Sequence, residues 1–380
     1  DAQESRGLGD VYKRQGKDCS TAEINPLFSD SVYIDRLSRI PAIMEMPYND
    51  IIRKFIDMYA GRLRNQVSFM LSACNFYMPI FEEALDAYGL PLELRYLPII
   101  ESALNPSAVS RAGASGLWQF MIGTGKIYGL ESNSLVDERR DPIKATWAAA
   151  RYLKEMYDIY GDWNLVIAAY NCGPGTINKA IRRANGETDY WKIYNYLPKE
   201  TRGYVPAFIA ANYVMTYYCD HNICPMETNI PASTDTVQVN KNLHFEQIAD
   251  LCNVPLDQIK SLNPQYKKQM IPGDSKPYTL RLPIDAISTF IDKQDTIYTH
   301  RADELFRNRK TAAVKDITPA TRKTTSAVAG KGNLTYYTIK SGDTLSTIAR
   351  KYGVTIKDIQ RWNGMSSTKI AAGKRLKIYK

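Results

Sequence analysis

The chain has 380 residues, of which 44% are hydrophobic and 23% are charged, and its formal net charge is +9 at pH 7. This length predicts two or three domains, and the hydrophobic content is enough for a sizeable core. No stretch approaches the ~18 consecutive apolar residues that a membrane-spanning helix needs, so we expect no such helix.

The N-terminal part is polar and has no regular pattern, and its short apolar groups are Leu27-Phe28 and Val32-Tyr33-Ile34. We predict that residues 1–40 form an irregular segment, and that its part from Ser20 to about Pro41 drapes over the domain that follows. The chain starts at Asp1 without a Met, and no signal-peptide pattern precedes Cys19. Either an export signal has been removed or the true start is missing.

Apolar residues recur at helical spacing from Asp50 to Leu71 and predict one long amphipathic helix, with Asn49 or Asp50 as its N-cap. A further helix is predicted from Met78 to Tyr88, because Gly89-Leu90-Pro91 stops it. We expect both helices to supply core contacts rather than chemistry.

One acid, Glu101, stands in the stretch from Leu97 to Phe120. It follows Leu97, Ile99 and Ile100, which we predict to form the buried end of a helix. A carboxyl held against apolar neighbours has its pKa raised, and it can stay protonated near neutral pH. That is the state that a general acid needs. An isolated Glu is more often a surface carboxylate at a helix end, so the assignment depends on the motifs around it.

The residues after Glu101 are suited to contact a ligand. Gly113, Ser115 and Gly116 allow close approach of the backbone. The run Trp118-Gln119-Phe120-Met121 combines an apolar platform with an amide, a mixture suited to a sugar ring.

Two helices are predicted beyond this segment. The first runs from Pro142 to Tyr160 and opens with an Asp-Pro pair, a capping residue followed by proline at the first helical position. The second runs from Asn164 to Asn171 and is broken by Gly173-Pro174-Gly175. Tyr170 and Asn171 therefore lie at a helix end, where side chains can reach into a cleft, although a tyrosine at helical spacing is more often part of a core.

Four ordered motifs resemble the catalytic domain of the family 1 lytic transglycosylases: Glu101-Ser102 with Ser110, Gly116-Leu117-Trp118-Gln119, Ala169-Tyr170-Asn171, and Glu200-Thr201-Arg202-Gly203-Tyr204-Val205. The resemblance covers residues 76 to 225. It implies a lysozyme-like, mainly helical fold and an enzyme that cuts the glycan strand of peptidoglycan between N-acetylmuramic acid and N-acetylglucosamine. The product would end in a 1,6-anhydro sugar, so no water would be consumed.

The same resemblance implies the roles of the site residues. Glu101 would donate a proton to the glycosidic oxygen and then act as base toward the C6 hydroxyl of the same muramic acid. That hydroxyl replaces the water and the second carboxylate that most glycosidases use. The implied substrate-binding residues are Ser110, Gln119, Met121, Tyr170, Asn171, Glu200 and Tyr204.

Two alternatives stay open at this point. A hydrolytic muramidase of goose-lysozyme type would need an aspartate to hold a water, and Asp137, Asp141 and Asp162 are candidates. A non-catalytic peptidoglycan-binding scaffold would leave the function to the C-terminal part of the chain, although all four catalytic motifs are intact.

The second half contains an internal repeat at an offset of 100 residues. The matching pairs are Phe245 and Leu345, Ile248 and Ile348, Ala249 and Ala349, Val254 and Val354, Ile259 and Ile359, and Asn263 and Asn363. The closing strands, around Leu280-Arg281-Leu282 and Leu376-Lys377-Ile378, are offset by 96, so the first copy has four extra residues. Each copy reads as strand, helix, turn, helix and strand.

The second copy, Tyr336 to Tyr379, resembles a LysM module, a βααβ unit that binds polymers containing N-acetylglucosamine. The matching motifs are Tyr337-Thr338-Ile339, Lys340-Ser341-Gly342-Asp343-Thr344-Leu345, Ile348-Ala349, Tyr352-Gly353-Val354 and Trp362-Asn363-Gly364. The glycan-binding residues that this resemblance implies are Gly342, Asp343, Thr344, Leu345 and Ile370. Core packing is the alternative for Leu345 and Ile370. The first copy lacks the Ser-Gly-Asp-Thr entry, and we interpret it as a degenerate LysM-like unit with a structural or weakly binding role.

Positive charge belongs to the C-terminal part of the chain. Residues 301–333 hold 8 basic and 3 acidic side chains, and residues 334–380 hold 10 and 2. The first range has little apolar content and is predicted to be a flexible basic linker. A basic binding module suits a polyanion, and peptidoglycan carries free carboxylates on its stem peptides. Nucleic acid is disfavoured as a partner, because no helix-turn-helix or aromatic strand platform is recognised.

The chain has 6 cysteines and 3 histidines. Cys219 and Cys224 are close in sequence, and a local disulfide between them would fit an oxidising compartment. A zinc site at His221 is disfavoured because no second Cys pair accompanies it, and we predict no metal and no cofactor.

These features predict a multidomain α+β protein, with a mainly α lysozyme-like catalytic domain followed by small βααβ modules of the LysM type. The predicted parts are an irregular segment (1–40), the helical domain (41–228, motif core 76–225), a degenerate LysM-like module (229–300), the basic linker (301–333) and the LysM module (334–380). This order resembles the membrane-bound D-type transglycosylases. It implies a monomer exported to the periplasm or cell envelope of a Gram-negative bacterium. Attachment to the outer membrane would need a lipid anchor that this chain does not display.

Overall fold

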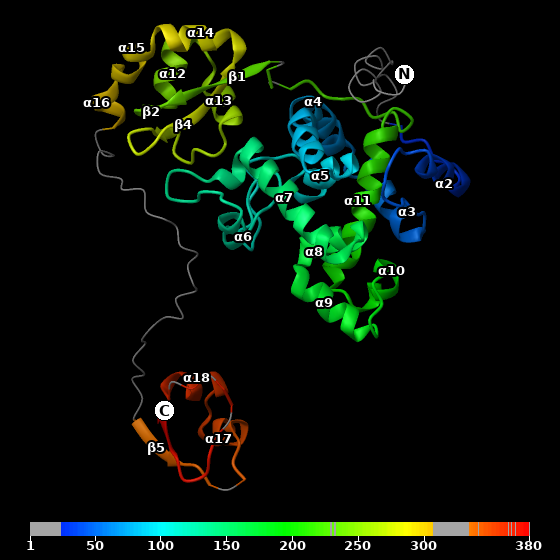
Figure 1. Ribbon diagram of the computed structural model, residues 1–380, viewed down its shortest axis with the longest axis vertical. Helices are drawn as coiled ribbons and strands as arrows, with labels where there is room; N and C mark the ends of the chain where they lie inside the picture. The colour runs from blue at the N-terminus through cyan, green and yellow to red at the C-terminus, as the bar shows by residue number, and fades with distance from the viewer. Residues whose placement is uncertain are drawn as a thin grey trace. The chain divides into compact units, whose positions relative to one another are not determined.

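The computed structural model describes residues 24–228, 230–231, 233–306, 334–340, 342–363, 365, 367–368 and 370–379. Contacts within the chain divide it into two compact units, residues 1–317 and 318–380 (Figure 1). The first unit is mainly helical and also contains small pairs of strands, and the second is one small module of helices and strands. The multidomain α+β class predicted from the sequence is confirmed.

Helix α11 (Lys199–Tyr217) is central to the helical part of the first unit. It is buried along most of its length and packs against α3, α5 and α8. A helix that is buried on nearly all sides can organise its neighbours around one core. The other helices of this part are α2 (Asp30–Ser38), α3 (Asp50–Ala60), α4 (Arg64–Ala87), η2 (Leu92–Tyr96), α5 (Leu97–Ser102), α6 (Ile122–Ile127), η3 (Glu138–Arg140), α7 (Pro142–Tyr160), α8 (Trp163–Cys172), α9 (Pro174–Arg183), α10 (Tyr190–Ile193) and η4 (Tyr194–Tyr196).

Two of the predicted helices have different bounds in the structure. The stretch from Asp50 to Leu71 forms parts of two helices, because the chain turns at Gly61, where a Cβ would stand 2.7 Å from the carbonyl oxygen of Asp57. The helix predicted to begin at Met78 is the second half of α4, which continues through Pro79. Buried packing on both sides of Pro79 outweighs the hydrogen bond that proline cannot make.

The prediction of an irregular N-terminal segment is wrong for α2. Tyr33 and Leu37 are four residues apart on one face of this helix, and both are buried. The ring of Tyr33 lies 5.4 Å from the ring of Tyr213 in α11. Tertiary packing therefore stabilises a helix whose own sequence has a weak helical pattern. Residues 1–23 lie outside the described part of the chain.

The LysM-like module follows the helical part within the same unit. Its elements are β1 (Thr234–Val239), β2 (Asn242–His244), α12 (Phe245–Cys252), α13 (Leu256–Leu262), β3 (Met270–Pro272), β4 (Tyr278–Pro283), α14 (Ile284–Asp292), α15 (Gln294–Thr299) and α16 (Ala302–Leu305). Strand β1 pairs antiparallel with β4, and β2 with β3. The core of this module also contains Leu135 and Val136, which come from the loop before α7. The module and the helical part are thus joined through a shared apolar contact.

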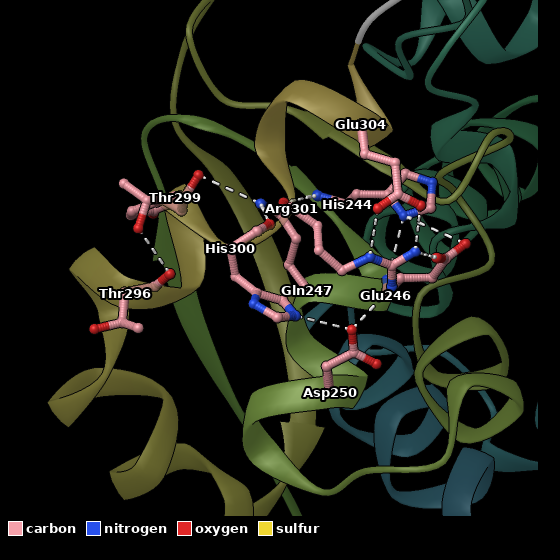
Figure 2. A network of polar contacts seen from close by, with 10 residues as sticks. His244, Glu246, Gln247, Asp250, Thr296, Thr299, His300, Arg301 and Glu304 are labelled. Carbon is pink, nitrogen blue, oxygen red and sulfur yellow. Dashed lines mark hydrogen bonds and ion pairs between the residues drawn. The ribbon is translucent and has the colours of Figure 1, made fainter.

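Ion pairs connect the two ends of this module (Figure 2). Arg301, just before α16, pairs with Asp250 at 3.0 Å, Glu246 at 3.3 Å and Glu304 at 2.7 Å. His300 Nε2 lies 3.0 Å from Asp250 Oδ2. The hydrogen bonds from His300 and Arg301 hold the pKa of Asp250 below its usual value. The predicted linker therefore begins with an ordered turn and α16, and residues 307–333 lie outside the described part of the chain.

The second unit contains β5 (Leu334–Thr338), α17 (Leu345–Tyr352), α18 (Ile356–Trp362) and β6 (Arg375–Tyr379). Strands β5 and β6 are antiparallel, and the unit has a hydrophobic core of its own. The order of these elements is the βααβ arrangement that the sequence predicts.

The internal repeat is visible in equivalent hydrogen bonds. Asn263 Nδ2 donates to the carbonyl oxygen of Arg281 at 2.7 Å, and the backbone N–H of Arg281 donates to Asn263 Oδ1 at 2.8 Å. Asn363 makes the same two bonds with Lys377, at 2.8 and 2.7 Å. The two asparagines are 100 residues apart and their partners 96, so the change of offset predicted from the sequence is confirmed.

The pairing of Cys219 with Cys224, which the sequence left open, is not present. Cys219 is a free thiol, whereas Cys224 is disulfide-bonded. The side chain of Cys219 is packed in the hydrophobic core, next to the turn in which the N–H of Ile223 donates to the carbonyl oxygen of Tyr218 at 2.9 Å.

Candidate active site

Glu101 lies in the last turn of α5, and α5 packs against α11. The hydroxyl of Tyr204 in α11 donates a hydrogen bond to Oε1 of Glu101. Burial raises the pKa of Glu101 to about 7, although the Tyr204 hydrogen bond lowers it and the negative charge of Glu200 raises it further. The raised pKa predicted from the sequence is confirmed, and the carboxyl is able to exchange a proton near neutral pH.

A cavity of about 430 Å³ opens at Glu101. Of the residues predicted for the site, Ser110 and Gln119 line this cavity together with Glu101. Its volume lies in the range of small-molecule sites. Tyr59 and Gln66, from α3 and the start of α4, also line it. They were not predicted from the sequence, because the whole stretch from Asp50 to Leu71 was expected to supply core contacts.

The loop from Ala108 to Phe120 is folded by its own hydrogen bonds. Ser110 Oγ accepts a bond from the N–H of Ala114 at 3.0 Å. Gln119 has a φ of 48°, and its Nε2 donates to the carbonyl oxygens of Gly116 at 2.8 Å and Ala108 at 3.2 Å. The two side chains predicted to contact sugar thus also hold this loop in shape.

Trp118 and Phe120 do not form the apolar sugar platform that the sequence predicts. Both side chains are buried, and Trp118 Nε1 donates to Thr146 Oγ1 in α7 at 2.9 Å. The tryptophan therefore faces the core rather than the ligand. Met121 is 45% exposed at the N-cap of α6 and is not among the residues that line the cavity at Glu101.

Three further predicted residues come from α8 and α11. The hydroxyl of Tyr170 donates to the carbonyl oxygen of Trp118 at 2.7 Å. Burial, and next the charge of Glu101, raise the pKa of Tyr170 well above its usual value, so this ring lies near the acid. Asn171 Oδ1 accepts a hydrogen bond from Thr201 Oγ1 at 2.9 Å, which joins the two helices. Glu200, in the first turn of α11, is exposed to solvent.

The aspartates considered for a hydrolytic mechanism have other partners. Asp137 is 1% exposed and forms an ion pair with Arg139 at 2.8 Å. Asp141 caps α7, where it accepts hydrogen bonds from the N–H groups at positions 143 and 144. Asp162 caps α8 through the N–H of Leu165 at 2.8 Å.

In the second unit, the predicted glycan-binding residues are arranged around the start of α17. Gly342 has a φ of 89°, and Asp343 Oδ2 accepts hydrogen bonds from the hydroxyl of Tyr337 and the N–H of Lys340, both at 2.8 Å. Thr344 caps α17.

The last two predicted glycan-binding residues contribute to packing. Leu345 is 2% exposed in the core of the unit, and Ile370 packs against that core. Core packing, the alternative given above, therefore accounts for Leu345.

Among the residues that the structure describes, no group of His, Cys, Asp and Glu side chains is arranged to hold a metal ion. Within the same residues, every helix is too short or too polar to cross a membrane.

The helical fold around Glu101 and the two βααβ modules define a class of protein, a lysozyme-like domain joined to LysM-type modules. Three family models match the chain. They are the transglycosylase SLT domain at residues 78–193, the LysM-like domain of the lytic transglycosylase MltD at 233–299, and the LysM domain at 337–378.

Comparison with named proteins identifies the family to which the chain belongs. The membrane-bound lytic murein transglycosylase D of Escherichia coli (strain K12) is 32% identical over 339 residues, 88% of this chain and 70% of the relative. The soluble lytic murein transglycosylase of the same strain is 33% identical over 124 residues, 31% of this chain and 19% of the relative. The crystal structure of the 70 kDa soluble lytic transglycosylase of Escherichia coli matches with 28% identity and a TM-score of 0.33, over 40% of this chain and 26% of that one. The chain belongs to the family of the membrane-bound lytic murein transglycosylase D.

Proposed function

We propose that this protein is a lytic transglycosylase of peptidoglycan. It cleaves the β-1,4 bond between N-acetylmuramic acid and N-acetylglucosamine and leaves a 1,6-anhydro ring on the muramic acid. The observation that carries the proposal is Glu101, a carboxyl with a pKa of about 7 that lines a cavity of about 430 Å³. A group that titrates near the working pH can both donate and accept a proton within one turnover.

The mechanism needs one acid. Neutral Glu101 donates its proton to the glycosidic oxygen as the bond from that oxygen to C1 breaks. The resulting carboxylate is stabilised by the hydrogen bond from Tyr204. It then takes the proton of the C6 hydroxyl while O6 bonds to C1, and this returns Glu101 to its neutral form. Because the nucleophile belongs to the same sugar, its attack is intramolecular and effective.

The surroundings of the other carboxylates favour this reaction over hydrolysis. Asp137 is ion-paired and buried, and Asp141 and Asp162 are N-caps. None of these roles leaves a carboxylate to position a water beside Glu101. The non-catalytic scaffold is also less favoured, because the acid keeps its partner Tyr204 and its cavity.

The remaining site residues take roles that their positions support. Ser110 and Gln119 contact the sugars from the cavity wall. Tyr170 and Asn171 hold the loop and α11 around the acid, and Tyr204 orients it.

The next two residues act at a distance from the proton transfer. Glu200 tunes the pKa of Glu101 and borders the substrate, since its charge acts on that carboxyl. Met121, exposed outside the cavity at Glu101, touches a more distant part of the strand.

The C-terminal module would hold the enzyme on its polymeric substrate. Gly342, Asp343 and Thr344 form the loop before α17, and Leu345 and Ile370 support that loop from the core. The relative is named a membrane-bound enzyme. That name supports a location in the bacterial envelope. We further propose that the protein is a monomer held at the outer membrane by a lipid anchor.

Mass spectrometry of the fragments released from purified peptidoglycan tests the function. The protein should release fragments that are lighter by one water molecule than the products of hydrolysis. The Glu101→Gln variant, which keeps the shape of the side chain but has no acidic proton, should lose about 10²- to 10⁴-fold in rate. Release of fragments with free reducing ends would show a hydrolase instead, and a fully active Glu101→Gln variant would remove Glu101 from the mechanism.

A further inference from the structure

The segment Gly113–Phe120, which contains the cavity residue Gln119, is held at both ends by one guanidinium. Arg139 Nη1 donates to the carbonyl oxygens of Gly113 at 2.8 Å and Phe120 at 2.9 Å. Between these ends, a Cβ on Gly116 would stand 1.7 Å from the carbonyl oxygen of Arg139. The conformation of this segment therefore depends on where Arg139 is held.

Asp137 holds Arg139 through two parallel hydrogen bonds. Arg139 Nε donates to Asp137 Oδ1 and Nη2 donates to Oδ2, both at 2.8 Å. The two side chains are buried, at 1% exposure for Asp137 and 5% for Arg139. Burial alone would raise the pKa of Asp137, but Arg139 and then Lys267 hold it below its usual value, so the carboxyl is ionised. A buried pair of this kind keeps its geometry only while its partners are in place.

The LysM-like module supplies Lys267, the second cation of this cluster. Its Nζ lies 3.6 Å from Asp137 Oδ2 and donates to the carbonyl oxygen of Asn133 at 2.8 Å. The backbones are also joined, because the N–H of Asp137 donates to the carbonyl oxygen of Gln265 at 2.9 Å and the N–H of Lys267 to that of Leu135 at 2.8 Å. Leu135 belongs to the core of the module. A continuous chain of contacts thus leads from the module to the active-site segment.

We propose that the LysM-like module is a positioning element of the active site. Lys267, acting through Asp137 and Arg139, holds the segment Gly113–Phe120 in the conformation that presents Gln119 to the substrate. The effect on catalysis rests on the proposed transglycosylase function, whereas the effect on the segment does not. Lys267 is a positioning residue, because it touches neither the cavity at Glu101 nor the acid.

The kinetic test uses Lys267→Met in the whole 380-residue chain. This change removes the ammonium group but keeps the apolar stem and the backbone hydrogen bonds. We expect kcat on soluble glycan strands to fall about tenfold, because small displacements of substrate-positioning groups are costly. The pH at which activity is half lost should stay the same, since Glu101 keeps its neighbours. Lys267→Arg, which preserves the charge, should restore most of the rate.

Lys276→Met is the matched control. Lys276 belongs to the same module and forms an ion pair with Glu131 at 2.7 Å, also across the junction with the helical part. It makes no contact with Asp137 or Arg139 among the ion pairs of the described residues. The control should keep wild-type kcat even if both variants lose some stability. Equal losses of kcat in the two variants, or wild-type kcat in Lys267→Met, would overturn the proposal.

Hydrogen exchange tests the positioning without any assay of activity. The N–H groups of Ser115 and Gly116 donate to the carbonyl oxygens of Phe120 at 3.1 Å and Ala108 at 3.0 Å. Both should exchange at least about tenfold faster in Lys267→Met and at the wild-type rate in Lys276→Met, because local opening is governed by local stability. Unchanged protection in Lys267→Met would overturn the proposal. If the wild-type protein released no glycan, the proposed function would fail, and this comparison would still decide whether the module holds the segment.

Discussion

At Glu101, opposing influences act on a single carboxyl. Burial disfavours its charged form, and the negative charge of Glu200 acts in the same direction. The hydrogen bond from Tyr204 favours the charged form. The resulting pKa of about 7 matches an acid that must be neutral before bond cleavage and charged after it.

Replacing the two neighbours of Glu101 should shift its pKa in opposite directions. Tyr204→Phe removes the hydrogen bond that favours the carboxylate, so the pKa rises. Glu200→Gln removes a negative charge, so the pKa falls. Because the neutral form is the active one, activity is present below the pKa and is lost as the pH rises through it. The profile of kcat/KM against pH should lose its alkaline limb at a higher pH in Tyr204→Phe and at a lower pH in Glu200→Gln.

The direction of these shifts does not depend on how much rate each variant loses. The reference is the wild-type protein, whose kcat/KM should fall as the pH rises through about 7. If the alkaline limb moved in the same direction in both variants, Tyr204 and Glu200 would not have opposite effects on the pKa of Glu101, whatever the absolute rates.

Glu101 should also make the protein less stable above neutral pH. In the unfolded chain this carboxyl ionises near the ordinary glutamate pKa of 4.5, whereas in the folded protein it stays neutral up to about pH 7. Between these values the unfolded state gains charge first, so stability falls as the pH rises, and the penalty is complete above pH 7. Glu101→Gln has no charge to bury. Its melting temperature should exceed that of the wild type at pH 8, and the difference should largely disappear near pH 4. A difference that stays constant with pH would contradict the raised pKa.

At the scale of elements, sequence patterns located Glu101, but they did not predict the contacts that hold the segments around it. The motif around Glu101 and the Asp-Pro start of α7 could be predicted from the sequence, because capping and burial leave local patterns. Asp137 was interpreted as a candidate to hold water, since a carboxylate two residues from an arginine has no pattern that identifies a buried pair. The contact of Leu135 with the LysM-like module joins residues more than about 100 positions apart, and no local periodicity predicts it.

The active-site segment offers a comparison of two glycines. Gly116 and Gly113 have φ angles of 89° and 88°, so alanine is strained at both. A Cβ on Gly113 would meet nothing within 4 Å, whereas one on Gly116 would stand 1.7 Å from the carbonyl oxygen of Arg139. Gly113→Ala should therefore cost about 1–2 kcal/mol of unfolding free energy. Gly116→Ala should cost at least about 2 kcal/mol more. The new Cβ would push the backbone of Arg139 away, and this movement would disturb the hydrogen bonds of the Arg139 side chain.

Urea unfolding of the two glycine variants measures this difference. Gly113→Ala serves as the control for backbone strain alone. Equal destabilisation of both variants would mean that the segment moves freely relative to Arg139, and it would also weaken the case for positioning through that residue.

For the whole molecule, the sequence predicted the order of its parts better than their connections. The repeat and the LysM resemblance located both modules, because small βααβ units keep their core and asparagine positions. The sequence did not reveal that residues 1–317 form one compact unit, in which the first module shares a core with Leu135 and Val136. The first module therefore belongs to the same compact unit as the catalytic part, whereas the second module is a compact unit of its own.

Two truncations should separate the roles of the two modules. A chain that ends after Phe306 keeps the first unit's described elements and the ion pairs of Arg301, so it should fold and cut soluble glycan strands at the wild-type rate. It loses residues 334–380, with 10 basic and 2 acidic side chains, so its binding to insoluble peptidoglycan should weaken severalfold. A chain that ends after Thr228 would expose Leu135 and Val136, and it should be unstable or insoluble. Co-sedimentation with peptidoglycan measures the binding, and it should fall with added salt only for the full chain. A stable, fully active chain ending after Thr228 would contradict the structural role of the first module, and undiminished binding after Phe306 would contradict the role of the second.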